Sequence, residues 1–445
     1  MKKHILLIGA GKSSPYLIDY LLKEAIHKNY LFTIIDRLLP TWLTENPLIY
    51  HATTLVIDVA DAAARKPFIQ QADVVISMLP AFMHPIVAQD CLEYGKHFFT
   101  ASYISEELKE LEPVLQQKGL FFLQECGLDP GLDHLSAMKI IDELHAKNAV
   151  ITSFTSYCGG LVAPEYIDNP FGYKFSWNPR NVITAGKNTA TYLQNNRLRY
   201  VPYHQLFKNA VPITVVDYGN YEGYPNRDSL NYQKIYGLHK VETMIRGTIR
   251  ADGYCEAWNI FVQMGLTDES VVLENANQYT YKEWLQCFLP IKFTEADFLE
   301  KLKQYYQISP TTWQKIESTG LVSDTPITLT KGTPADILQE LLERKWKLKD
   351  TDKDLIVLVH HFEYTIENVL YKTESTLVLK GENAIYTAMA KTVGLPLAIA
   401  VDLFLQGTWH DKKGLFLPIE KAIYIPILQE LAKQGISLVE STHTL

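Results

Sequence analysis

Two glycines and a serine follow an apolar run near the start of the chain, in a spacing typical of a phosphate-binding turn. The pattern is Gly9-x-Gly11-x-x-Ser14, directly after residues 4–9, and Pro15 stands at a suitable first position of a helix. Gly9 permits a tight turn, and Gly11 lets a pyrophosphate approach the N–H groups of the helix end. Ser14 replaces the third glycine of the pattern and can add a hydroxyl donor. The turn predicts dinucleotide binding, although an ordinary glycine-rich turn has the same composition.

An acidic residue ends the next apolar strand, at Asp36 in "TIIDR". A carboxylate at this place accepts hydrogen bonds from the ribose hydroxyls and repels a 2′-phosphate, which favours NAD over NADP. Arg37 follows immediately and could instead support the phosphate of NADP. The sequence therefore favours NAD and leaves NADP open.

Later strands supply further cofactor residues. Asp58, in "VIDVAD", is expected near the adenine. Ser77, Met78 and Leu79 end the fourth expected strand and should line the cofactor trough, because parallel sheets bind ligands at the carboxyl ends of their strands.

The elements that position these residues alternate between strand and helix through the first 130 residues. Strands are expected over residues 4–9, 30–37, 53–59, 72–80, 97–103 and 120–127. Short buried strands separated by helices predict a parallel sheet with right-handed crossovers. The fold class is therefore α/β, with a Rossmann-type dinucleotide-binding domain over residues 1–130.

The remaining residues predict a second, mixed-sheet α/β domain with a helical insertion. Residues 131–268 and 349–381 are expected to form this substrate and dimerisation domain, and residues 269–348 the insertion. The helices near 382–445 could pack back on the first domain.

The composition is that of a soluble globular protein. The chain has 445 residues, 47% apolar and 21% charged, with a formal net charge of −8, which argues against nucleic-acid and membrane partners. Its five scattered cysteines form no CxxC pair, so neither a disulfide framework nor a zinc site is expected, and a cytoplasmic location fits best. His360 and His361 are neighbours on a strand and face opposite sides, so no metal site is predicted.

Several longer motifs resemble one enzyme family. They are "ISMLPAFMHPIVAQDCLEYGKHFFTASYISEELKEL", "ECGLDPGLDHLSAMKIID", "SYCGGLVAPEYIDNPFGYKFSW", "GYPNRDSLNY", "MIRGTIRADGY" and "GLPLAIAVDLFLQG". Together they make nearly the whole chain similar to the glutamate-forming saccharopine dehydrogenases (saccharopine reductases) of lysine metabolism. The resemblance implies oxidation of saccharopine with a nicotinamide cofactor to L-glutamate and 2-aminoadipate 6-semialdehyde. It also implies a homodimer.

The resemblance also assigns site residues. It implies that Ser102 and Tyr103 bind substrate and that Asp129 holds the substrate amine or the nicotinamide ribose. Asp129, water and the substrate's own carboxylates are all candidates for the general base. Arg227 would clamp a carboxylate, since a planar guanidinium matches that geometry. Three residues of "RGTIR" would lie on the cofactor side: Thr248, Ile249 and Arg250.

Two other functions compete with this interpretation. A carbon–nitrogen reductase of polyamine synthesis, of the carboxynorspermidine or homospermidine synthase type, would need a site lined with carboxylates, whereas Arg227, Arg246 and Arg250 suit an acidic amino acid. A nucleotide-sensing regulator without turnover is the second alternative. Cys158 could suggest a thiol nucleophile, but no base motif accompanies it, and a core cysteine is expected. His134 is expected to be structural or to line the cleft.

Overall fold

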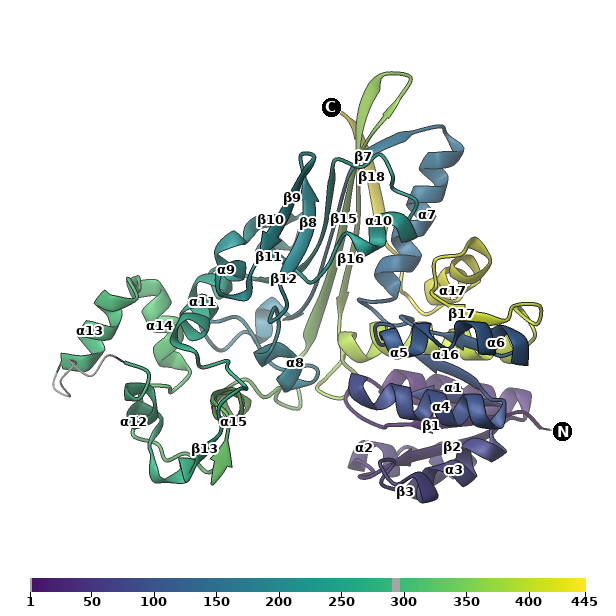
Figure 1. Cartoon of the computed structure of the whole chain (residues 1–445), viewed down its shortest axis with the longest axis horizontal. Helices are drawn as coiled ribbons and strands as arrows, with labels where there is room; N and C mark the ends of the chain where they lie inside the picture. Colours follow the sequence, from purple (N-terminus) through teal and green to yellow (C-terminus); the bar gives the residue numbers. More distant parts are fainter. Residues whose placement is uncertain (1, 290–296) are drawn as a thin grey trace. The chain divides into compact units, whose positions relative to one another are not determined.

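The chain forms two structural units, each built from separate stretches of sequence. The computed structural model describes residues 2–289 and 297–445 (Figure 1). Unit 1 comprises Met1–Ala149 and Gly381–Val439, and unit 2 comprises Val150–Lys380 and Glu440–Leu445. The chain thus leaves the first unit, completes most of the second, and returns.

Unit 1 is built on a seven-stranded sheet in the order β17-β6-β5-β4-β1-β2-β3, and its recorded strand pairings are parallel. Its strands are β1 (His4–Ile8), β2 (Leu31–Asp36), β3 (Thr53–Val56), β4 (Val74–Ser77), β5 (His97–Thr100), β6 (Phe121–Leu123) and β17 (Gly414–Phe416). The six predicted strands of the first 130 residues are all present, and the seventh comes from the far end of the chain. This confirms the predicted α/β class and parallel sheet.

Helices pack around this sheet, and its inner strands β1 and β4 are buried at almost every position, as expected of parallel strands that are covered on both faces. They are α1 (Pro15–Lys28), α2 (Thr41–Thr44), α3 (Ala62–Gln71), α4 (His84–Tyr94), α5 (Glu106–Lys109), α6 (Glu112–Lys118), α7 (Leu132–Ala146), α16 (Ala388–Leu405) and α17 (Lys421–Lys433). In β1, the side chains of Ile5, Leu6, Leu7 and Ile8 have no exposed surface.

The C-terminal helices complete unit 1. Helix α16 packs against α1, and Gly394 permits the close approach, since a Cβ there would lie 3.1 Å from the Leu17 Cβ. Among the described residues, α16 is the helix long and apolar enough to span a membrane, but 72% of it is buried inside the structure, as in the core helix of a globular protein. Helix α17 packs against α7, where Tyr424 Oη donates a hydrogen bond to Asp142 Oδ2 at 2.6 Å. Helix α7 therefore lies in unit 1, and the structural boundary falls one helix later than the predicted boundary at 130.

Unit 2 is built on a nine-stranded mixed sheet in the order β10-β11-β12-β7-β15-β16-β18, with β8 and β9 attached beside β12. Its strands are β7 (Val150–Val162), β8 (Ala190–Gln194), β9 (Arg197–Val201), β10 (Val211–Val215), β11 (Gly219–Pro225), β12 (Thr243–Ala251), β15 (Asp354–Ile366), β16 (Val369–Lys380) and β18 (Val439–Thr444). Strands β7 and β12 are parallel, whereas β15 runs antiparallel to both β7 and β16. The second sheet is mixed, as predicted.

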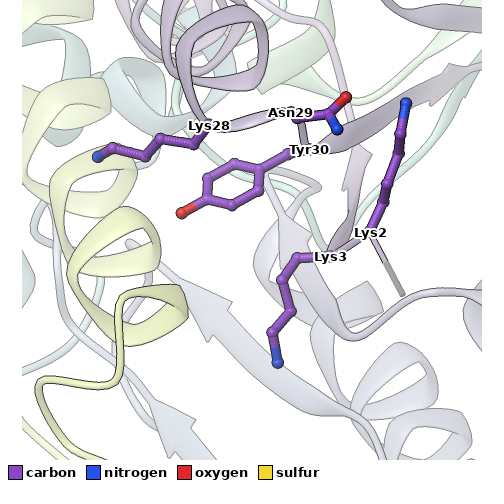
Figure 2. A pocket seen from close by; sticks show the side chains of 5 residues that line it. All are labelled: Lys2, Lys3, Lys28, Asn29 and Tyr30. Carbon is purple, nitrogen blue, oxygen red and sulfur yellow. The ribbon is translucent and has the colours of Figure 1, made fainter.

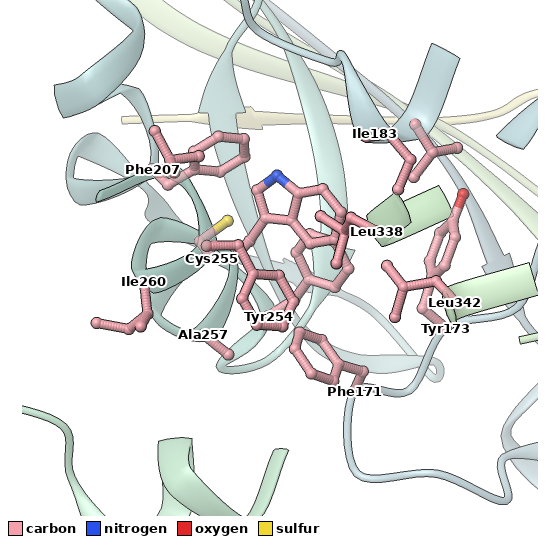
Figure 3. Packing of buried hydrophobic residues seen from close by; sticks show 14 of the residues in the cluster. Phe171, Tyr173, Ile183, Phe207, Tyr254, Cys255, Ala257, Ile260, Leu338 and Leu342 are labelled. Carbon is pink, nitrogen blue, oxygen red and sulfur yellow. The ribbon is translucent and has the colours of Figure 1, made fainter. Parts of the chain in front are cut away.

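The remaining helices of unit 2 surround one large aromatic core. They are α8 (Pro179–Ile183), α9 (Tyr203–Leu206), α10 (Asn231–Ile235), α11 (Tyr254–Met264), α12 (Tyr281–Gln286), α13 (Phe298–Tyr305), α14 (Pro310–Ser318) and α15 (Pro334–Lys345), with a small sheet of β13 (Leu273–Glu274) and β14 (Lys331–Gly332). Leu338 and Leu342 of α15 belong to the same buried cluster as Phe171 and Tyr254 (Figure 3). The predicted insertion over residues 269–348 is mainly helical where it is described, and it shares the core of unit 2. Residues 290–296 of that stretch lie outside the described residues.

Candidate active site

The glycine turn after β1 is shaped by contacts that only glycine allows. Gly9 has φ +103°, and a Cβ there would lie 2.9 Å from the carbonyl oxygen of Met78. Its N–H donates to Ile35 O at 2.9 Å, which ties the turn to β2. At Gly11, in contrast, a Cβ would meet no atom within 4 Å. Gly9 therefore serves the fold, while Gly11 leaves open space against bare main chain, as a bound pyrophosphate requires.

Ser14 stabilises this turn from inside. Its side chain has no exposed surface, and its hydroxyl donates to the carbonyl oxygen of Gly11 at 2.7 Å. The predicted phosphate contact of Ser14 stays a prediction. In this geometry the hydroxyl proton is already used to hold the loop.

Asp36 lies beside the same turn, at the carboxyl end of β2. Its Oδ2 accepts a hydrogen bond from Ala10 N at 2.6 Å, and its Oδ1 accepts one from Leu38 N at 3.1 Å. The carboxylate is therefore fixed next to the glycine turn, where the adenosine ribose lies in this type of fold. Arg37 is exposed. Asp58 is also exposed and accepts a hydrogen bond from Ala60 N at 3.0 Å.

The strand order reverses between β1 and β4, because β1 is followed by β2 and β3 on one side and by β4 and β5 on the other. Open α/β sheets bind their ligands at this switch point, outside the carboxyl ends of the strands. Ser77, Met78 and Leu79 leave β4 there, and Met78 N donates to Ile8 O at 2.8 Å. The predicted trough residues are thus brought next to the glycine turn.

A buried histidine connects the ends of β4 and β5. His84 begins α4 and is only 2% exposed. Its Nδ1 is 2.8 Å from the Ser77 hydroxyl and its Nε2 is 2.7 Å from the Ser102 hydroxyl. Burial away from water lowers the pKa of His84 to about 4, so the ring is neutral at neutral pH.

Tyr103 and Asp129 connect the ends of β5 and β6. The Tyr103 hydroxyl donates to Asp129 Oδ1 at 2.7 Å, and both side chains are half-buried. Three of the predicted substrate residues, Ser102, Tyr103 and Asp129, are therefore gathered at one edge of the unit 1 sheet.

A buried hydrogen bond between Glu125 and His134 supports the loop that carries Asp129. Glu125 Oε2 lies 2.9 Å from His134 Nε2, and Glu125 Oε1 accepts a hydrogen bond from Ile104 N at 3.1 Å. Both ionisable side chains are at most 1% exposed. The contact joins the loop after β5 to helix α7 and supports the structural alternative for His134. Gly131 lies so close to Gly127 that a Cβ would come within 2.1 Å of the Gly127 nitrogen.

Arg227 lies in unit 2, on an exposed turn after β11 with φ 51°. The neighbouring Asp228 accepts two hydrogen bonds at its Oδ1, from the Thr191 hydroxyl and from Leu230 N, each at 2.8 Å. Asn226 N donates to Arg246 O at 2.8 Å, which fastens the turn to β12. The turn is thus held in place by the residues on both sides of Arg227.

The three residues of "RGTIR" that are predicted to lie on the cofactor side differ in their exposure to solvent. Thr248 is half-buried, whereas Ile249 has no exposed surface and Arg250 is 3% exposed. The Arg250 guanidinium lies over the rings of Tyr173 and Tyr254, at 5.3 and 5.5 Å, and donates to Ile249 O at 2.9 Å. Arg250 therefore packs inside unit 2 as placed, and its predicted contact with a cofactor stays a prediction.

A separate hollow opens at the opposite edge of the unit 1 sheet. It is lined by Lys2, Lys3, Lys28, Asn29 and Tyr30, which precede β1 and β2 (Figure 2). Lys28 is already paired with Glu24 and Asp402, each at 2.7 Å. Because this is the amino end of the strands, the hollow is not the dinucleotide site.

The fold and the geometry of unit 1 define an NAD(P)-binding oxidoreductase class: a parallel sheet, a glycine turn at the switch point, and polar side chains at the carboxyl edge. Comparison with known proteins agrees. Residues 5–123 match the saccharopine dehydrogenase NADP binding domain, and residues 127–436 match the saccharopine dehydrogenase C-terminal domain. The chain therefore belongs to the saccharopine dehydrogenase family.

Individual relatives extend over both units. The chain is 36% identical to a saccharopine dehydrogenase [NADP(+), L-glutamate-forming] of Saccharomyces cerevisiae, over 99% of this chain and all of that protein. It is also 36% identical to the mitochondrial alpha-aminoadipic semialdehyde synthase of Mus musculus, over 98% of this chain, but it spans only about half (47%) of that protein's length. The solved structure of the apo saccharopine dehydrogenase (L-Glu forming) from Saccharomyces cerevisiae superposes with a TM-score of 0.88, at 34% identity, covering 99% of this chain and 100% of that chain.

Two residues of this edge, His84 and Glu125, are not among those predicted from the sequence. His84 stands in "AFMHPIV", where a polar residue interrupts an apolar stretch just before a helix. Glu125 stands in "LQECG", directly after a fully apolar strand. A charged or polar residue at such a place was the available signal, but its partners come from other parts of the chain.

Proposed function

We propose that this protein oxidises saccharopine with a nicotinamide cofactor and releases L-glutamate and 2-aminoadipate 6-semialdehyde. The main support is the full-length match to the yeast L-glutamate-forming enzyme, which extends over the glycine turn of unit 1 and the arginine turn of unit 2. A polyamine reductase would require carboxylates around its amine substrate, whereas the candidate residues of unit 2 are arginines.

The residues of unit 1 fit a nicotinamide dinucleotide. The open space at Gly11 admits a pyrophosphate, and Asp36 is fixed beside the turn for the ribose. When bound, the cofactor accepts the hydride from the carbon of the lysine-derived arm. Asp129, whose Oδ1 accepts a hydrogen bond from the Tyr103 hydroxyl, is the carboxylate proposed to hold the substrate amine. Arg227 of unit 2 is proposed to hold a substrate carboxylate. Water hydrolyses the resulting imine.

The activity is tested directly by mixing the purified protein with saccharopine and either NAD or NADP. Nicotinamide reduction is followed by absorbance at neutral and alkaline pH, and glutamate is identified as the product. Putrescine in place of saccharopine is the control for the polyamine alternative. Absence of reduction with saccharopine and both cofactors would contradict the proposal.

Asp36 supports a preference for NAD, although the yeast relative is named for NADP(+). We expect Asp36→Asn to raise the ratio of kcat/KM for NADP to that for NAD by about tenfold or more, because the substitution removes a charge that repels the 2′-phosphate. Asparagine keeps one oxygen that can accept from Ala10 N, so the contact with the glycine turn should remain, whereas the exposed contact with Leu38 N is lost.

The measurement is kcat/KM with each cofactor for the wild type and the variant. Asp61→Asn is a matched control, since Asp61 caps α3 away from the turn through Ala63 N at 2.9 Å. A wild type that uses NADP better than NAD, or a variant with an unchanged ratio, would show that Asp36 does not select the cofactor.

Arg227 is expected to bind a substrate carboxylate. Arg227→Ala should raise the KM for saccharopine by about 10- to 100-fold, as expected for the loss of a charge-assisted, bidentate contact. The KM for the cofactor should not change. The KM of Arg227→Lys for saccharopine should lie between those of the wild type and Arg227→Ala, because lysine keeps the positive charge but lacks the paired N–H donors of a guanidinium.

Steady-state kinetics with either substrate varied measures both constants. Arg199→Ala, an exposed arginine on β9 of the same unit, serves as the control for loss of one surface charge. An unchanged KM for saccharopine in Arg227→Ala would exclude this role.

Two further parts of the proposal concern assembly and location. We propose a homodimer, which light scattering on the purified protein would test. A cytoplasmic location also stays a prediction, and the mouse relative is named mitochondrial.

A further inference from the structure

His84 is a buried, polar group placed between two hydroxyls at the edge where ligands bind. Its two ring nitrogens face Ser77 at the end of β4 and Ser102 just after β5, at 2.8 and 2.7 Å. A third hydroxyl, of Thr100, is more distant from Nε2 at 3.4 Å. These contacts lie wholly within unit 1. His84 therefore joins a residue of the cofactor trough to a residue expected to bind substrate.

The neutral ring can donate at one nitrogen and must accept at the other. Ser77 is fully buried, and among the residues that the structure describes its hydroxyl has His84 Nδ1 as its hydrogen-bond partner. If Nδ1 carried the proton, the Ser77 hydroxyl hydrogen would be buried without an acceptor, which is costly. The favoured arrangement has the Ser77 hydroxyl donating to Nδ1, with the ring proton on Nε2.

This tautomer determines what Ser102 can do. The Nε2–H donates to the Ser102 oxygen, so the Ser102 hydroxyl keeps its own proton for another acceptor. Ser102 is only half-buried, in contrast to Ser77 and His84, and its proton can reach a ligand. In this hydrogen-bond chain Ser77 donates to His84 and His84 donates to Ser102, so each donor is directed from the core toward the sheet edge. Hydrogen bonds linked in this way polarise and strengthen one another.

We propose that His84 is a positioning residue that orients the Ser102 hydroxyl as a donor to a carboxylate of the substrate. The inference rests on the proposed function, because it assigns Ser102 an acidic amino-acid ligand. His84 itself touches neither substrate nor cofactor in this arrangement and needs no change of charge. Protonation of the ring requires pH near 4, so the chain stays in one state through the neutral range.

Two substitutions of His84, by glutamine and by asparagine, distinguish the roles of the two ring nitrogens. Glutamine places an amide near the position of Nε2 and can still donate to Ser102, whereas asparagine reaches only the position of Nδ1 and leaves Ser102 without its partner. We expect His84→Asn and Ser102→Ala each to raise the KM for saccharopine by about tenfold, and His84→Gln to raise it by less than about threefold. The KM for the cofactor should stay within about twofold in all three variants.

The double variant His84→Asn, Ser102→Ala tests the coupling. If His84 acts through Ser102, the double variant should be no more impaired than Ser102→Ala alone, since the effects of coupled residues do not add. Equal KM values for His84→Asn and the wild type would overturn the proposal, as would fully additive effects or equal impairment of the asparagine and glutamine variants.

A measurement without turnover keeps the inference separate from the proposed activity. Nitrogen NMR of the ¹⁵N-histidine-labelled wild type should report a proton on Nε2 of His84 and an unprotonated Nδ1 at pH 7. The His84→Gln spectrum assigns the signal by its absence. A proton on Nδ1 alone, or on both nitrogens, would overturn the inference whatever the kinetic constants of the variants. If the labelled protein has the expected tautomer but does not oxidise saccharopine, the proposed function fails and the hydrogen-bond chain stands.

Discussion

Gly11→Ala should raise the KM for the dinucleotide by about 100-fold, because several charge-assisted hydrogen bonds from main-chain N–H groups to the pyrophosphate would be blocked. The added methyl group meets no protein atom within 4 Å, so it would occupy only the space left for the ligand. The protein itself should fold normally. Its melting temperature is expected to stay within about 3 °C of the wild type, since the substitution introduces no clash.

Gly9→Ala is the contrasting variant, because its added methyl group would clash with the protein itself. There the Cβ would lie 2.9 Å from the Met78 carbonyl oxygen, at a backbone φ of +103°. We expect this variant to lose stability as well as cofactor binding. Fluorescence titration with the reduced dinucleotide measures binding, and thermal unfolding measures stability. If Gly11→Ala binds the dinucleotide as tightly as the wild type, the pyrophosphate does not lie at this turn.

Gly131→Ala is expected to destabilise the protein by about 4 kcal/mol or more, in the range that marks a forced rearrangement of buried backbone. A Cβ at this position would lie 2.1 Å from Gly127 N and 2.2 Å from Gly127 O, and φ is +145°. Neither the Gly127 backbone nor the buried Glu125–His134 pair behind it can move cheaply. The same loop presents Asp129 to Tyr103, so activity should fall together with stability.

Gly95→Ala provides the control. Gly95 also has a positive φ, of +66°, but a Cβ there would have nothing within 4 Å, so the cost should be about 1 kcal/mol from backbone strain alone. Urea unfolding followed by circular dichroism compares the two variants with the wild type. Equal midpoints for Gly131→Ala and Gly95→Ala would contradict the close approach of Gly127 and Gly131.

The local features of this protein could be predicted from its sequence. The glycine turn, the acidic end of β2 and the apolar strands of unit 1 each depend on a few consecutive residues, whose periodicity and backbone preferences are legible in one stretch of chain. The longer motifs identified the family for the same reason, and the comparisons confirm it.

Contacts between segments that are distant in the sequence could not be predicted and are known only from the tertiary structure. Strand β17 completes the first sheet from the other end of the chain, through parallel pairing of Leu415 with Phe122, and helix α7 joins unit 1 by packing on α17. Neither partner is recognisable from local sequence, because strand pairing and helix packing depend on which apolar faces are left to cover.

The same limit applies to the candidate site. Ser102, Tyr103 and Asp129 were expected by resemblance to bind substrate, but only the fold shows that they gather at one edge of the unit 1 sheet. The phosphate contact expected of Ser14 stays a prediction, and the structure adds that the Ser14 hydroxyl donates to Gly11 O. His84 contacts Ser77 at the end of β4 and Ser102 after β5, and Glu125 contacts His134 of α7, at 2.7–2.9 Å. Sequence thus determined the turn chemistry and the family of this protein, because both depend on short stretches of residues. Only the fold decided which polar side chains meet, because a hydrogen bond depends on distance in space and not along the chain.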